Sequence, residues 1–314
     1  MINDINVLVL GASTVSGALN VTTTGGAITQ SGPLTVAGVT TLAAGANDIR
    51  LTNALNNFST VGITSGNIVM LTDANALMMN MSTASANISI SANDLTIGGA
   101  VASTDGTLNL TGANTVTQLA NLTANGANNV TVTTTTGSIT MAPAATTTSG
   151  TGAISYTAGT DVTLGSLTTA GAVNVIANGG SVLSATGSGT NVTAGANSTL
   201  QAFNGVVGTQ AAPVTVNVNP GTLSVRATAR AIPPCFPESA CRPGASVLTA
   251  PADGEDLELS APKESGYSDS LPFSCLHGRP PDQQRHEYRP EDGQGRHGHP
   301  QIEAQAERPN SCSA

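Results

Sequence analysis

The side chains in residues 1–230 that could act as acids, bases or metal ligands are aspartates. Asp48 and Asp94 stand in two near-identical stretches, ANDI and ANDL, at an offset of 46, and Asp4 and Asp73 occupy matching places at an offset of 69. Both offsets are multiples of 23, so a repeat of that length would place Asp48, Asp73 and Asp94 near one edge. A carboxylate ladder of this kind could bind Ca²⁺ or supply an acid–base pair.

The alternative is that each aspartate caps a turn before a strand. Asn67, Asn87 and Asn129 stand before similar strands, and Asn and Asp both hydrogen-bond to nearby backbone in Asx-type turns. Carboxylates stacked without partners would repel one another. We therefore favour the turn-capping role, and we expect no catalytic, cofactor-binding or metal site in this part of the chain.

A polysaccharide-cleaving enzyme is the main alternative of a chemical kind. Such enzymes need clustered carboxylates together with a cation that stabilises developing charge. Arg50 is the one cation well inside the repeats, and it lies two residues from Asp48 on the same face of a strand. This spacing favours a solvated ion pair, so the sequence predicts a protein that is not an enzyme.

Cysteine and histidine are confined to the last part of the chain. They are Cys235, Cys241, Cys275, Cys312, His277, His286, His297 and His299. Zinc sites usually contain cysteine pairs two to four residues apart, whereas five residues separate Cys235 from Cys241. We expect no metal and no cofactor here either.

The composition changes abruptly near Arg230. Residues 1–230 contain no Lys, Glu, Cys, His or Trp, and are built mainly from Thr, Ala, Gly, Asn, Ser, Val, Leu and Ile. Residues 231–314 hold twelve of the sixteen prolines and most of the charge. We predict a disordered Pro/Arg/Glu-rich tail over 229–314. A shift of reading frame at the change of composition is a second hypothesis for its origin.

Short alternating runs recur throughout residues 1–228, for example NIVML, NISIS, DLTIGG, TLNLTG and NVTVT. Each alternates apolar residues with Thr, Ser or Asn, as a half-buried strand does, and Gly and Asn between the runs suit tight turns. A unit of about 23 residues with two or three such runs predicts one turn of an all-β solenoid. We expect about ten rungs around a thin aliphatic core.

Threonine-rich runs such as Thr131–Thr140 could line a regular face that binds ice or carbohydrate. Their spacing along the sequence is too irregular for a repeated Thr-x-Thr array. Threonine is also favoured in strands for its β-propensity alone. We therefore interpret these residues as solvent-facing strand positions without a specific ligand.

The stretch GASTVSGALNVTTTGGAITQSGPLTVAGVTTLAAGANDIRLTNALNNFSTVGITSGNIVMLTDANAL, Gly11–Leu77, resembles the repeats of filamentous-haemagglutinin-like and autotransporter-type bacterial adhesins. The resemblance implies a right-handed parallel β-helix in a protein that is secreted or attached to the cell surface. It also implies export through an outer-membrane barrel, which would be a transient partner. The secretion domain and barrel of that family have no counterpart in this sequence, so we expect the export signal to lie outside it.

From these observations we expect a structural or adhesive repeat segment of a large bacterial adhesin. The alternatives are a β-helix carbohydrate-active enzyme and a passive spacer. Expected partners are glycans or proteins of a host cell or matrix, or further copies of the chain, since the end of an uncapped solenoid exposes unpaired strand edges. We expect no nucleic-acid partner. No apolar run reaches the roughly 18–20 residues of a membrane span.

Overall fold

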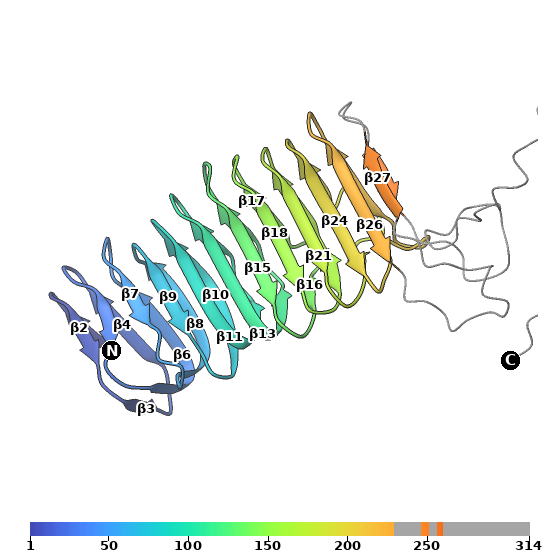
Figure 1. The fold of residues 1–314 in the computed structure, drawn as a ribbon. Helices are drawn as coiled ribbons and strands as arrows, with labels where there is room; N and C mark the ends of the chain where they lie inside the picture. The colour runs from blue at the N-terminus through green and yellow to red at the C-terminus, as the bar shows by residue number, and fades with distance from the viewer. Residues whose placement is uncertain (229–245, 251–255, 260–314) are drawn as a thin grey trace, which may run out of the picture.

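A computed structural model of the chain describes residues 1–228, 246–250 and 256–259. Within these ranges the regular secondary structure is entirely β-strand. The chain winds as a parallel solenoid whose turns stack along one axis, from the blue N-terminal rungs to the orange C-terminal ones (Figure 1). The predicted all-β solenoid is therefore confirmed. Each rung contributes strands to three stacked sheets, here named face A, face B and face C in the order in which the chain visits them from Leu8 onward.

Face A is a ladder of eleven parallel strands. They are β2 (Leu8–Leu10), β5 (Ile28–Gln30), β7 (Ile49–Leu51), β9 (Val69–Thr72), the first half of β11 (Ile88–Ile97), the first half of β13 (Leu108–Gln118), β15 (Val130–Thr134), β18 (Ile154–Ala158), β21 (Val173–Ala177), β24 (Ser198–Phe203) and β26 (Leu223–Thr228). Eleven strands at about 4.8 Å per step make a rod roughly 50 Å long.

Faces B and C are built mostly from shorter strands. Face B comprises β3 (Ser13–Val15), the first halves of β6 (Leu34–Ala43), β8 (Asn57–Ser65) and β10 (Ala76–Ala84), the second halves of β11 and β13, β16 (Ile139–Met141), β19 (Val162–Leu164) and β22 (Val182–Ser184). Face C comprises β1 (Ile2–Asp4), β4 (Leu19–Thr23), the second halves of β6, β8 and β10, β12 (Val101–Ser103), β14 (Leu122–Ala124), β17 (Thr146–Ser149), β20 (Ser166–Thr169), β23 (Val192–Ala194) and β25 (Val214–Val218).

The core is a stack of inward-facing aliphatic side chains. Strand after strand alternates buried and partly exposed positions, as β15 and β21 do, because successive residues of a strand point to opposite faces. Equivalent positions stack directly, so that Ile49 lies between Ile28 and Val69 in the ladder. The aromatic residues among the buried hydrophobic side chains of the described residues are Phe58 and Tyr156. The expected thin aliphatic core is confirmed.

The rungs vary in length more than the sequence period suggests. Where Thr60 pairs with Met78 the numbering advances by 18 from one rung to the next, and where Leu122 pairs with Thr147 it advances by 25. Register shifts within the long paired strands, for example between Met79 and Ser82 or between Ala92 and Asp94, fall where a strand passes from one face to the next. The variation therefore lies mainly in the corners. The predicted repeat length falls inside this range but does not describe any long stretch of the chain.

Corners stack closely on one another as well. A Cβ atom placed on Gly106 would collide with the backbone of Ala86 in the preceding rung. Glycine is needed at this corner because only a residue without a side chain allows the two backbones to approach so closely.

Two strands of the C-terminal region pair with the last rung. β27 (Ser246–Ala250) runs antiparallel to β26, and β28 (Asp256–Leu259) runs antiparallel to β25. Figure 1 shows β27 beside β26 at the end of the rod. The predicted disordered tail otherwise concerns residues outside the described part of the chain. No helix within the described ranges is long and apolar enough to cross a membrane.

Candidate functional site

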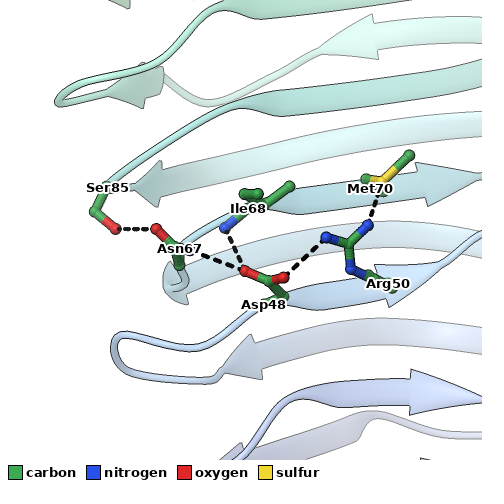
Figure 2. A network of polar contacts seen from close by, with 6 residues as sticks. All are labelled: Asp48, Arg50, Asn67, Ile68, Met70 and Ser85. Atoms are coloured by element: carbon green, nitrogen blue, oxygen red, sulfur yellow. Dashed lines mark hydrogen bonds and ion pairs between the residues drawn. The ribbon is translucent and has the colours of Figure 1, made fainter.

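Asp48 lies at the corner that precedes face A and belongs to a polar network that links three rungs (Figure 2). Its Oδ1 accepts hydrogen bonds from Asn67 Nδ2 at 3.0 Å and from the backbone N–H of Ile68 at 3.1 Å. Arg50 donates to its Oδ2 at 2.9 Å and, through the other guanidinium nitrogen, to the sulfur of Met70 at 3.0 Å. Both oxygens of the Asp48 carboxylate therefore accept hydrogen bonds, one from Arg50 and the other from the corner of the next rung.

The Asp48–Arg50 pair is the solvated ion pair that the sequence predicts. The two side chains are 25% and 44% exposed, respectively. Partial burial favours the neutral carboxyl group, but hydrogen bonds from Arg50, Ile68 and Asn67 outweigh it and lower the pKa of Asp48. An exposed pair of this kind contributes little to stability by itself.

Asp94 lies at a different corner, between face A and face B within β11. Its Oδ1 accepts hydrogen bonds from the hydroxyl of Thr115 at 2.6 Å and from Asn114 Nδ2 at 2.8 Å, both one rung further on. Asn93 donates to its Oδ2 at 3.0 Å. The bond from Thr115 contributes most to lowering the pKa of Asp94, against a smaller desolvation effect.

Asp73 also lies between faces A and B, but it is buried, with 4% of its surface exposed. Its two oxygens accept the backbone N–H groups of Phe58 at 2.6 Å and Asn75 at 2.9 Å. Desolvation raises the pKa of Asp73 by more than these two bonds lower it. Its role is to satisfy buried backbone donors where the chain turns.

The three aspartates do not lie together on one edge, because Asp48 lies before face A whereas Asp73 and Asp94 lie between faces A and B. The alignment of all three expected from the repeat length is therefore wrong. Strand pairing places Asp48 level with Ile68 and Asn87, whereas Asp94 pairs with Ala76 on one side and Thr115 on the other. Because the corners differ in length, the number of residues between two of these aspartates does not equal a whole number of rungs, and the aspartates come to lie at different positions around the rod. Among the described residues no three His, Cys, Asp or Glu side chains gather as a metal site would require.

Amide side chains act at the corners as the carboxylates do. The predicted corner role is found, but most of these bonds run to the next rung, and of the three aspartates only Asp73 makes the local bond of an Asx-type turn, from Asn75. Asn87, Asn129 and Asn197 precede the face A strands β11, β15 and β24, and each accepts through Oδ1 a backbone N–H of the next rung, at 2.9, 2.8 and 3.0 Å. Asn191, which is almost fully buried, does the same before face C at 3.1 Å. Asn and Asp are interchangeable here because both present an acceptor oxygen at the same distance from the backbone.

A buried polar cluster inside the rod was not expected from the sequence. Gln118, Thr147 and Tyr156 are each fully buried and come from three successive rungs. The Tyr156 hydroxyl donates to Gln118 Oε1 at 2.6 Å and lies 2.6 Å from the Thr147 hydroxyl. Burial raises the pKa of Tyr156. The available signal was a glutamine at an inward position of an alternating strand, where an aliphatic residue is the norm.

Comparison with known proteins places the first part of the chain among repeats. Residues 1–65 match a family model described as "Repeats of unknown function (DUF5649)". No curated protein and no solved structure matches the chain. The repeat character found in the sequence and in the stacked rungs is thus shared with this family over the first three to four rungs.

The outward side chains of face A form two columns, an alignment that the spacing along the sequence did not predict, although Thr-x-Thr occurs on one of these rungs only. The first column is Ser89, Asn109, Thr131, Ser155, Asn174 and Thr199. The second column is Ser91, Thr111, Thr133, Thr157, Ile176 and Gln201. Irregular corners make these residues look irregularly spaced along the chain, but strand pairing brings them into register.

Two further features considered in the sequence are the threonines outside face A and the cysteines and histidines of the last part of the chain. Face C carries one outward threonine column, with Thr148 paired to Thr168 and Thr168 to Thr193. The cysteines and histidines considered as metal ligands all lie outside the described residues.

Proposed function

We propose that residues 1–228 are a structural and adhesive repeat segment of a large bacterial surface or secreted protein, exported through an outer-membrane barrel and without catalysis of its own. The observation that carries this proposal is the unbroken ladder of face A, eleven strands in parallel register over a continuous core. A solenoid of this kind presents long, repetitive surfaces, and it holds whatever is attached to one end at a fixed distance from the other.

The use of the carboxylates also supports this proposal over an enzyme. Asp48 lies at the corner before face A, whereas Asp73 and Asp94 lie between faces A and B on neighbouring rungs and out of register with each other. The oxygens of each accept hydrogen bonds from the backbone or side chains around them. A hydrolase or lyase would need carboxylates that converge on one substrate position.

Adhesion is tested with beads coated with the full chain and incubated with cells or extracellular matrix. We expect more beads to be retained than beads coated with an unrelated protein of similar charge. Equal retention would contradict an adhesive role and leave the segment as a spacer.

Catalysis is tested by incubating the purified chain with a panel of glycans and measuring new reducing ends. We expect no turnover. Cleavage that disappears in Asp48→Asn, Asp73→Asn or Asp94→Asn would replace the proposal with the enzyme alternative.

A further inference from the structure

We propose that face A between β11 and β24 binds an uncharged, hydroxyl-rich polysaccharide chain laid along the axis of the rod. The inference rests on the proposed adhesive function and assigns its partner and its surface. In these rungs face A is wider than the other two faces. Strands such as β15, β18 and β21 are five residues long and present two outward positions each, whereas β14, β16 and β19 are three residues long and present one.

The polar groups of this surface are not used by the fold. In the two columns, eleven of the twelve side chains carry hydroxyl or amide groups, and none of these groups makes a hydrogen bond to another described residue. The corner side chains are the opposite case, since Asn87, Asn129 and Asn197 each accept a bond from the next rung. Donors and acceptors of face A are thus available to water or to a ligand.

The same corner asparagines add fixed donors along one side of the surface. Because Oδ1 of Asn87, Asn129 and Asn197 is held by a backbone N–H, the orientation of each amide is set. The Nδ2 groups of these three side chains have no hydrogen-bond partner within the described ranges. Each asparagine precedes an outward residue of the first column by two positions, so the amides lie beside this column on three of its six rungs.

Charge decides which class of partner fits. The two columns between β11 and β24 contain no charged residue. An anionic polymer would therefore meet a cation only at the end of the second column, where Gln201 pairs with Arg226 of β26. An apolar protein surface would leave the hydroxyl groups without partners, which costs free energy for each group that is buried. A neutral polysaccharide offers hydroxyl groups that both donate and accept, and threonine and serine hydroxyls rotate to meet either.

The dimensions suit an extended chain. Six strands at about 4.8 Å per step give a surface roughly 24 Å long, and β15, β18, β21 and β24 lie side by side along the rod (Figure 1). Each contact is weak, because a hydrogen bond to a ligand replaces one to water. Affinity therefore depends on many rungs acting together on one polymer.

The test uses affinity electrophoresis of the full chain in gels that contain hydroxyethyl cellulose, dextran or galactomannan, all of which are uncharged. Carboxymethyl cellulose serves as the anionic comparison on the same backbone as the first. We expect retardation by at least one neutral polymer. The triple variant Thr111→Val, Thr133→Val, Thr157→Val should weaken it at least about tenfold, since three hydroxyls are lost.

A matched control exists on face C. The triple variant Thr148→Val, Thr168→Val, Thr193→Val removes the same number of hydroxyls from an equally aligned column and should change retardation less than about twofold. Competition of the unmodified chain with soluble oligosaccharide from the retarding polymer gives a second readout that needs no variant, and it should abolish retardation.

Three results would overturn the inference: no retardation by any neutral polymer, equal loss in both triple variants, or retardation by carboxymethyl cellulose alone. Failure of this inference is distinguishable from failure of the proposed function. Coated beads that still adhere to cells, although no neutral polymer is bound, would leave the adhesive role standing and assign it to another surface or partner.

Discussion

The corners and the broad face of this solenoid use the same polar residues in opposite ways. Asn56 at a corner is fully buried, and its amide bonds to Gln30, to the backbone N–H of Leu34 and to two carbonyl groups. Asn174 on face A is partly exposed and its amide makes no hydrogen bond to another described residue. Corners must satisfy backbone groups that leave the ladders, whereas strand pairing already satisfies the backbone of face A, so its side chains remain available.

The largest expected effect is at a corner. Asn56→Ala leaves several buried partners without hydrogen bonds and should lower the free energy of unfolding by about 3 kcal/mol. Asn174→Ala is the matched control and should change it by less than about 0.5 kcal/mol. Urea denaturation followed by circular dichroism measures both. Equal effects of the two variants would remove the distinction between corner and face.

A smaller loss is expected inside the rod. Tyr156→Phe keeps the ring in the core but removes the hydroxyl that contacts Gln118 and Thr147, and should cost about 1–2 kcal/mol. The same urea titration applies. An unchanged midpoint would mean that Gln118 and Thr147 satisfy each other without the tyrosine.

The converse case is Thr40, whose hydroxyl is buried and has no partner in the described residues. Thr40→Val replaces an unsatisfied hydroxyl with a methyl group of similar size and should stabilise the protein by about 1 kcal/mol. Thr133→Val, on the surface of face A, is the control and should be close to neutral. Destabilisation by Thr40→Val would show that the hydroxyl is satisfied in solution, for example by internal water.

The smallest effects are those of pH. The lowered pKa of Asp94 means that its contribution to stability is present above the unfolded-state pKa, near 4, and is lost as the pH falls through the folded-state value. The stability of Asp94→Asn should therefore fall less steeply than that of the unmodified chain as the pH is lowered from about 5 to about 2.

Asp73 should behave in the opposite sense, because burial raises its pKa. Protonation relieves the cost of its buried charge, so the unmodified chain should gain stability relative to Asp73→Asn as the pH falls from about 7 to about 4. Thermal melts across the pH range test both variants. If the melting temperatures of the unmodified chain and of both variants changed with pH in parallel, the pKa shifts of Asp73 and Asp94 would be contradicted.

Much of the rod could be predicted from the sequence because its signals are local. Alternation within runs such as Ile88–Ile97 follows from the geometry of a strand, and Gly and Asn between runs follow from the geometry of a turn. The DLTIG stretch that begins at Asp94 and the DVTLG stretch that begins at Asp161 are a true repeat. Pairing of Asp94 with Thr115, then of Val116 with Ile139 and of Ile139 with Val162, carries Asp94 to Asp161 in three rungs.

What the sequence alone determined is that the chain alternates, turns often, and carries almost no charge over residues 1–230. These properties specify strands, an aliphatic interior and a solenoid. Only the tertiary structure decided which residues share a level of the rod, because each corner has its own length and small differences accumulate from rung to rung. That accumulation separates Asp48 from Asp73 and Asp94, and strand pairing brings Thr111, Thr133 and Thr157 into one column.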